Sequence, residues 1–167
     1  VGRITEGVGR LNRIVSSLLT YTRPLRLNTH AVNLADVVEE TLAFYAIDIE
    51  RQRDDIEIHR DFPVKPLICN LDPEQLQQVI LNLLQNATQA MAKGGKLTVK
   101  VYENDNNATF CVGDTGKGMN EEVQEKLFTP FFTTKEDGTG LGLVTSKKII
   151  DAHEGEIHVE SEPNTGT

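Results

Sequence analysis

The segment from Asp72 to Met91 constrains the fold more than any other part of this chain. Asp72 can accept hydrogen bonds from the first N–H groups of a helix, and Pro73 suits a first helical turn, so this pair predicts a helix start. The glycine pair Gly94–Gly95 predicts where the helix stops. The apolar residues that recur at helical spacing between these signals are Val79, Leu83, Ala87 and Ala90. The pattern predicts a long helix with one buried face.

The same helix carries two asparagines on one face. Asn82 and Asn86 are four residues apart, so their side chains lie one above the other. An asparagine carbonyl is a neutral oxygen ligand that suits Mg²⁺, which commonly takes few protein ligands beside phosphate oxygens and waters. Asparagine side chains also bond neighbouring backbone groups without any ligand. From this helix alone, the two interpretations are equally favoured.

Helices and strands are intermixed along the rest of the chain. Asn33, with Asp36 at the third position, resembles a capping box and starts a helix of about 18 residues. Further predicted elements are strands at 56–62, 67–71 and 157–159, a hairpin of 97–101 and 108–112 with its turn at 104–107, and helices at 120–127 and 143–152. This mixture predicts an α+β fold, a two-layer α/β sandwich.

The N-terminal residues predict a separate helix. Apolar residues recur at alternating three- and four-residue steps from Ile4 to Tyr21, a heptad-like stripe typical of a helix that packs against other helices. A plain amphipathic surface helix is the alternative. Arg23-Pro24 ends the pattern, because proline cannot continue the hydrogen-bond ladder. We expect a helix over residues 1–24, a linker over 25–32 and one domain over 33–167.

Composition excludes several classes of function. The formal net charge of −8 disfavours a nucleic-acid or anionic-membrane surface, and it requires a bound polyanion to be held by local donors. Cys69 and Cys111 have no metal-ligand spacing and fit a reducing cytosol. No apolar run approaches the roughly 18 residues that span a bilayer. Both ends of the 167-residue chain read as cut, so we expect a fragment of a longer protein.

Two glycine-rich turns occur where a nucleotide could bind. Residues 114–118, Asp-Thr-Gly-Lys-Gly, follow a predicted strand. A carboxylate there can accept a hydrogen bond from the adenine amino group, and glycines let the backbone approach a flat base. Residues 138–142, Gly-Thr-Gly-Leu-Gly, open a helix whose N-terminal N–H groups can face a phosphate. This is not a Walker A loop, because the Gly-Lys-Ser/Thr ending is missing. Each run alone is also an ordinary turn.

Taken in order, five motifs resemble the boxes of sensor histidine kinases, in the ATPase superfamily shared with DNA gyrase, the Hsp90 chaperones and MutL. They are Asn82-x-x-x-Asn86-Ala87, Asp114-x-Gly116-x-Gly118, Phe128-Thr129-Pro130-Phe131-Phe132, Gly138-Thr139-Gly140-Leu141-Gly142 and Gly166-Thr167. The match extends from about Asn33 to the C-terminus and looks most like nitrogen-regulation and zinc-responsive sensors. It implies a Bergerat-type ATP fold, a mixed sheet covered by three helices, after one helix of a dimerisation hairpin. The family's final strand after Thr167 is expected to be missing, which leaves an unpaired edge.

The resemblance also implies a site for ATP and Mg²⁺. Asn86 would coordinate Mg²⁺, and Asn82 would support the phosphate side. Asp114 would read adenine, with help from Gly116 and Gly118. The other residues expected to contact ATP are Met119, Phe131, Lys135, Gly138, Thr139, Gly140, Leu141, Gly142 and Thr167.

Residues 116–141 would include a lid over ATP, anchored by Phe128, Phe131 and Phe132. Simple core packing is the alternative for these rings. Lys135 on this lid is the candidate for contacting the terminal phosphate, and a solvated surface lysine is equally favoured. Asn82 and Lys135 are therefore the candidate catalytic residues.

Asn82 distinguishes between activities within the superfamily. Hydrolytic members such as gyrase carry a glutamate one turn before the metal-binding asparagine, where it activates water. Asn82 cannot act as a general base, and Glu74 lies about three turns away. The resemblance therefore implies a protein histidine kinase that transfers the γ-phosphoryl of ATP. The alternative is a non-catalytic nucleotide-binding interaction or phosphatase-promoting module, and a hydrolysing ATPase is disfavoured.

None of the four histidines has the family's acceptor context, a histidine followed by Glu and then Asn-Pro. His30 lies in the predicted linker, His59 and His158 lie in strand patterns, and His153 follows the last helix. We expect the acceptor histidine on a helix outside this chain, in cis or in trans, so the fragment should not phosphorylate itself. Expected partners are a response-regulator receiver domain and a second copy in a full-length homodimer, not nucleic acid. The expected location is the cytoplasm, with an inner-membrane anchor of the parent left open.

Overall fold

The computed structural model describes residues 9, 11, 15–16, 18–19, 21–52, 55–135 and 138–167. The elements are β1 (His30–Asn33), α2 (Leu34–Gln52), β2 (Ile56–Asp61), β3 (Ile68–Leu71), α3 (Pro73–Ala90), β4 (Gly95–Asn104), β5 (Asn107–Asp114), α4 (Glu121–Lys126) and α5 (Gly142–Ala152). No helix in these ranges is long and apolar enough to cross a membrane.

The main sheet is mixed and has the order β2-β4-β5. β2 runs parallel to β4, and β4 pairs antiparallel with β5, in a register that sets Leu97 opposite Asp114 and Asn104 opposite Asn107. Asp105 and Asn106 form the two-residue hairpin turn with φ of 49° and 65°, the left-handed conformation that such turns require. The predicted hairpin is confirmed. A separate two-stranded sheet pairs β1 antiparallel with β3.

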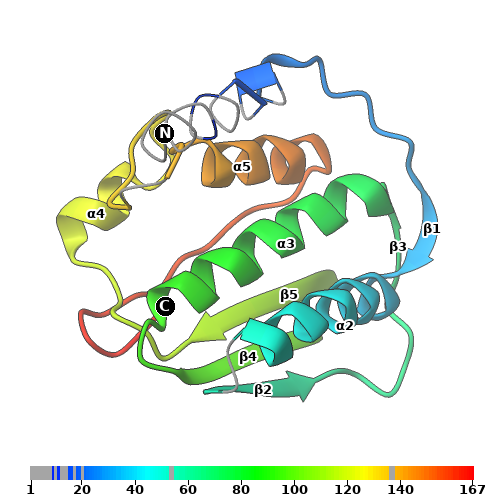
Figure 1. Ribbon diagram of the computed structural model, residues 1–167. Helices are drawn as coiled ribbons and strands as arrows, with labels where there is room; N and C mark the ends of the chain where they lie inside the picture. The colour runs from blue at the N-terminus through cyan, green and yellow to red at the C-terminus, as the bar shows by residue number, and fades with distance from the viewer. Residues whose placement is uncertain are drawn as a thin grey trace.

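The helices form a layer over one face of the main sheet. Figure 1 shows α3 running between α2 and α5, with β4 and β5 beside it. α3 buries Leu76, Val79, Ile80, Leu84 and Ala87, which meet the inward side chains of β4 in the core. Of the predicted apolar stripe, Leu83 and Ala90 are only half-buried. The α+β class and the mixed sheet with helices are as expected.

Asp72 joins three separate parts of the chain. Its carboxylate caps α3 by accepting from the Gln75 N–H (3.1 Å) and also accepts from the Asn28 N–H (2.8 Å). Its own N–H donates to His153 Nε2 at the end of α5 (2.9 Å). Because Nε2 accepts, His153 carries its proton on Nδ1, which donates to the Ile149 carbonyl (2.8 Å). The linker, α3 and α5 therefore meet at one buried residue, with the carboxylate holding the linker and α3 and the backbone N–H holding α5.

Two predictions about the ends of the domain differ from the structure. Residues 30–32, expected in the linker, lie in β1, because β3 provides a partner strand for them. Residues 157–159, predicted as a strand, form no ladder with any described residue. Alternation of apolar and polar residues fits a strand, but a strand also needs a neighbour at hydrogen-bonding distance. Asn33 caps α2 as predicted, through its side-chain contacts with Ala35 and Asp36.

Tyr21 and Arg23, near the predicted end of the N-terminal helix, contact α5. Lys148 Nζ on α5 donates to the carbonyls of Tyr21 and Arg23, both at 2.9 Å, and lies 5.8 Å from the centre of the Tyr21 ring. Described residues of the predicted heptad stripe, such as Leu11 and Val15, are exposed. The remainder of that stripe lies largely outside the described residues.

Replacing Asp72 by alanine should lower the free energy of unfolding by about 1–3 kcal/mol, because a helix cap and a tether to the linker are lost together. Asp72→Asn keeps a capping oxygen and should cost less. Urea unfolding of the three proteins at neutral pH measures both differences. Equal stability of the wild type and Asp72→Ala would contradict the assigned role.

The gap between wild type and Asp72→Asn should also depend on pH. Burial raises the pKa of Asp72, but the N–H groups of Asn28, Gln75 and Glu74 lower it more, to below its ordinary value. The charge therefore stabilises the fold above an unfolded-state pKa of about 4, and this contribution disappears as the pH falls through the lower folded-state value. A gap that stays constant from pH 7 to pH 3 would contradict this.

Candidate nucleotide-binding site

The site is built along the solvent-facing side of α3. Packing fixes the helix by its other face, so three amide side chains, Asn82, Asn86 and Gln89, follow one another at steps of four and three residues. From Asn82 to Ala90 the helix rises about 12 Å. The glycine run at 138–142 lies at the Asn82 end, and the run at 114–118 lies at the Ala90 end.

At the Asn82 end, α3 and α5 are fastened together. Asn82 Nδ2 donates to Ser146 Oγ (2.9 Å), and Ser146 is 2% exposed. Gly142 lies so close that a methyl group on it would overlap Asn82 Oδ1. Leu141 provides no side-chain cap for α5, which leaves the first N–H groups of this helix available to an anion. This end is suited to a phosphate.

The glycine run also meets the phenylalanine motif. Phe131 donates its N–H to the Gly140 carbonyl (3.1 Å), and a methyl group on Gly140, where φ is +67°, would overlap the Phe131 backbone. Phe131 itself has a positive φ, and its side chain is 58% exposed. Gly138 donates to the Lys135 carbonyl (3.2 Å), and Thr139 Oγ1 accepts from the Leu141 N–H (3.4 Å). The predicted phosphate run and lid are therefore adjacent.

At the other end, Asp114 is the last residue of β5. Its Oδ1 accepts from the Gly116 N–H at 2.7 Å, and its backbone exchanges two hydrogen bonds with Thr167, at 2.8 and 3.3 Å. Burial raises the pKa of the Asp114 carboxyl above its ordinary value, against the opposing N–H groups of Gly116 and Thr167 and the charge of Lys135. The hydrogen bond from Gly116 holds Oδ1 of Asp114 in place. The other carboxylate oxygen, Oδ2, can accept a hydrogen bond from a ligand.

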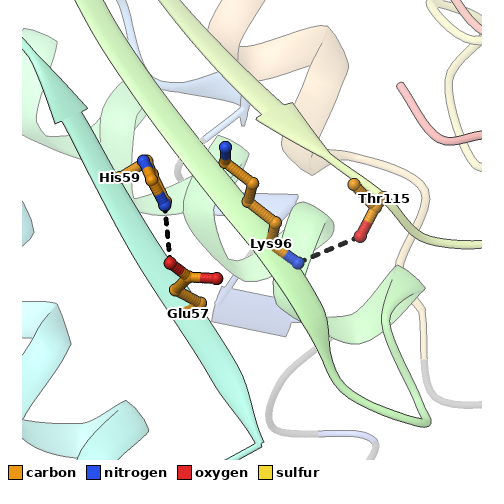
Figure 2. Close-up of polar contacts among 4 residues, drawn as sticks. All are labelled: Glu57, His59, Lys96 and Thr115. Carbon is orange, nitrogen blue, oxygen red and sulfur yellow. Dashed lines mark hydrogen bonds and ion pairs between the residues drawn. The ribbon is translucent and has the colours of Figure 1, made fainter.

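Thr115 holds the turn after Asp114 in place. Figure 2 shows its hydroxyl beside the start of β4, where Oγ1 accepts from the Lys96 N–H (2.9 Å). The next residues pack against the end of α3. Lys117 donates its N–H to the Ala90 carbonyl (3.2 Å), and a methyl group on Gly116 would overlap the same carbonyl. The turn that carries Asp114 is thus fixed to both β4 and α3.

Gly118 and Met119 pack against the C-terminal segment. Gly118 has φ of +59°, and a methyl group on it would overlap the Glu162 carbonyl. The Met119 N–H donates to Ser161 Oγ, which also lies 2.9 Å from Thr167 Oγ1. Sequence reasoning missed Ser161, and its isolated position in the sequence gives no signal of this role.

Lys135 lies between the two ends, over the middle of α3. Its Nζ donates to Asn86 Oδ1 and to Gln89 Oε1, both at 2.6 Å. The ammonium is half-buried, and its pKa is lowered first by burial and then by Lys117, while Asp114 raises it. Sequence reasoning missed Gln89, although its place three residues after Asn86 could have indicated it.

The donor set fits Mg²⁺ held mainly by a nucleotide. Within the described residues, no group of three or more His, Cys, Asp or Glu side chains could hold a metal ion. Two amide oxygens, Asn86 Oδ1 and Gln89 Oε1, nevertheless converge on one cation. Neutral oxygens of this kind suit a metal whose other ligands are phosphate oxygens and waters.

Two surface hollows, of about 520 and 400 Å³, lie away from this site, one beside Ile157 and the other beside Tyr102.

A protein-family model described as histidine kinase-, DNA gyrase B-, and HSP90-like ATPase matches residues 71–167. The chain belongs to this family. The sensor histidine kinase ZraS of Klebsiella oxytoca is 41% identical over 160 residues, which are 94% of this chain and 34% of ZraS. The chain thus spans about one third of the length of that relative.

Solved structures of histidine kinases agree with this membership. The nucleotide-free catalytic domain of ThkA is 32% identical, with a TM-score of 0.74 over 83% of this chain and 91% of that one. ThkA in complex with the response regulator TrrA is 29% identical, with a TM-score of 0.81 over 99% of this chain and 48% of that one. This chain is an ATP-binding catalytic domain of a two-component sensor histidine kinase, as the motifs indicated.

Gly142→Ala should weaken both the fold and nucleotide binding, because the added methyl group displaces Asn82 from its bond with Ser146. We expect a loss of about 1–3 kcal/mol in the free energy of unfolding, the usual cost of overpacking. Gly113→Ala is the matched control, since a methyl group there makes only ordinary contacts from 3.7 Å. It should change stability by less than about 1 kcal/mol. Urea unfolding and calorimetry with Mg-ADP measure both effects, and equal behaviour of the two variants would count against the assigned packing.

Proposed function

We propose that this domain binds Mg-ATP and transfers its γ-phosphoryl group to a histidine on another segment of the parent kinase. The phosphoryl group then passes to an aspartate of a response regulator. The observation that carries the proposal is the line of amides on α3, with a capless helix N-terminus at one end and a fixed carboxylate at the other. This line provides donors and acceptors in the order phosphate, metal and base.

Each end of the site has a defined task in this proposal. The carboxylate of Asp114 accepts from the adenine amino group, with Gly116, Gly118, Met119 and Thr167 forming that end. The second glycine run, with Thr139, Leu141 and the first N–H groups of α5, holds the phosphates. Mg²⁺, when bound, neutralises charge on the phosphates, and Asn86 Oδ1 would be its protein ligand.

Asn82 supports transfer rather than hydrolysis. Its amide donates to Ser146 and its oxygen faces Gly142, so it fastens the phosphate end of the site and cannot take a proton from water. Lys135, already beside Asn86, has the charge and reach to contact the terminal phosphate. Catalysis by these residues consists of positioning and charge stabilisation.

Three of the four histidines are poorly placed as acceptors. Both ring nitrogens of His153 are engaged, with Asp72 and Ile149. His59 lies on the exposed face of β2 beside Glu57, away from the helices (Figure 2). His158 is paired with Glu156 at the surface. An acceptor from elsewhere in the parent, in cis or in trans, fits these observations.

The proposal includes the wider setting of the domain. Residues 30–167, which include β1, are the catalytic domain, 25–29 the linker and 1–24 a helix of a dimerisation hairpin in a homodimeric parent. Contact of Lys148 with Tyr21 and Arg23 supports a direct connection between the helix and the domain. The crystal structure of ThkA in complex with the response regulator TrrA supports a receiver domain as partner here. Because ATP is the donor, the domain works in the cytoplasm.

Asp114→Asn should invert the base preference of the site. Gly116 already holds one side-chain oxygen, so an asparagine would turn its NH₂ group toward the ligand, where it faces the adenine amino group as donor against donor. Mg-ADP should bind about 10- to 100-fold more weakly, while Mg-IDP, with an accepting oxygen at that position, should gain relative to it. Calorimetry with both nucleotides measures this. An unchanged preference for ADP would reject Asp114 as the base-reading residue.

Transfer itself is tested with γ-labelled ATP on the full-length parent kinase. We expect acid-labile label on a histidine outside residues 30–167, and its loss in Asn86→Ala because the metal ligand is removed. Gln85→Ala, at the exposed position directly before Asn86 on α3, is the matched control and should keep transfer. ATP binding without transfer would favour a nucleotide-binding interaction module, and rapid release of phosphate would favour a hydrolase.

A further inference from the structure

Lys135 closes the middle of the site in the structure. Its ammonium donates to Asn86 Oδ1 and Gln89 Oε1 at 2.6 Å each, so two oxygens from successive turns of α3 hold one cation. The backbone beneath it is also fixed, because the Lys135 N–H donates to Thr133 Oγ1 (3.1 Å) and its carbonyl accepts from Gly138. The ammonium is thus held at rest by side chains that belong to the helix and not to the lid.

Asn86 cannot serve this ammonium and a metal ion at the same time. Mg²⁺ requires its oxygen ligands at about 2.0–2.1 Å in nearly octahedral order. An ammonium 2.6 Å from the same oxygen would lie within a few ångströms of the metal, where the two positive charges repel each other strongly. Asn82 lies one turn earlier, where its Nδ2 donates to Ser146 Oγ and its Oδ1 faces Gly142.

We propose that Asn86, Gln89 and Lys135 form a latch in which the Lys135 ammonium occupies the metal position until Mg-nucleotide displaces it. The inference rests on the proposed function, since it takes Asn86 as the metal ligand. On displacement, the four-carbon side chain of Lys135 swings from the amide oxygens to the phosphates that the metal brings in. Gln89 acts only in the resting state, as a positioning residue that holds the ammonium.

In this latch, only binding of a metal-bound nucleotide has to break the hydrogen bonds of Lys135 with Asn86 and Gln89. Adenine and phosphates that arrive without a metal use Asp114 and the N–H groups of α5, and neither contact removes Lys135 from Asn86. A metal ion at Asn86 Oδ1 would break the hydrogen bond from Lys135 to that oxygen, and its positive charge would also repel the ammonium from Gln89 Oε1. Removal of the Lys135–Gln89 hydrogen bond should therefore increase the affinity for Mg-nucleotide and leave the affinity for metal-free nucleotide unchanged. If Gln89 had only a structural role, its replacement would not change one affinity without the other.

The test is calorimetry of ADP binding, with Mg²⁺ and with EDTA, to the wild type and to Gln89→Met. ADP is used because it lacks the terminal phosphate. A contact between that phosphate and the displaced Lys135 would offset the cost of breaking the resting hydrogen bonds. We expect Gln89→Met to bind Mg-ADP about three- to tenfold more tightly and metal-free ADP within about twofold of the wild type. Gln85→Met, an exposed glutamine one turn earlier, is the matched control and should equal the wild type in both conditions.

If Gln89→Met changes the stability of the fold, Lys135→Met provides an independent measurement. Lys135→Met should also tighten Mg-ADP binding, yet weaken binding of Mg²⁺ with a non-hydrolysable ATP analogue, because the lysine contact with the terminal phosphate is lost. If neither variant tightens Mg-ADP, or if both conditions shift equally, the latch is wrong. If the wild type binds no ADP in either condition, the proposed function fails instead.

Discussion

The packing of α3 is the interaction on which the rest of this domain depends. One side of the helix is buried against the sheet, α2 and α5 through residues such as Val79, Ile80 and Leu84, each at most 1% exposed. Because 3.6 residues make a turn, this burial fixes where the opposite side points. Asn82, Asn86 and Gln89 gain their common direction from the core, and hydrogen bonds with Ser146 and Lys135 then hold the side chains in place. The accuracy of the site therefore depends on hydrophobic packing.

Local signals in the sequence were sufficient for much of this arrangement. The helix start at Asp72-Pro73 and the four-residue step between Asn82 and Asn86 depend only on nearby residues. The two-residue turn at Asp105 and Asn106 fits residues that tolerate positive φ, which is also a local property. The two glycine runs could be assigned to the two ends of a nucleotide site because the resemblance to the family gave each run a role. The atoms that each run contacts could not be predicted from the sequence.

Features that depend on distant partners could not be predicted in this way. β1 forms because β3 (Ile68–Leu71) lies beside it, and no local pattern within residues 25–32 indicates that partner. Residues 157–159 alternate like a strand but lack a paired neighbour in the described part of the chain. Gln89 and Ser161 are polar residues of common types, so their roles appear only when Lys135 and Met119 are brought to them across 46 and 42 residues.

The use of amides along α3 has a physical consequence for switching. A carboxylate in place of Asn86 would hold Lys135 as a half-buried ion pair, and separating such a pair costs several kcal/mol more than releasing a hydrogen bond to a neutral oxygen. A neutral oxygen accepts a monovalent ammonium and a divalent metal with no change in its own charge. It also adds no repulsion toward phosphates in a chain with net charge −8. In the proposed latch, neutral amide oxygens would thus let one position exchange cations at low cost.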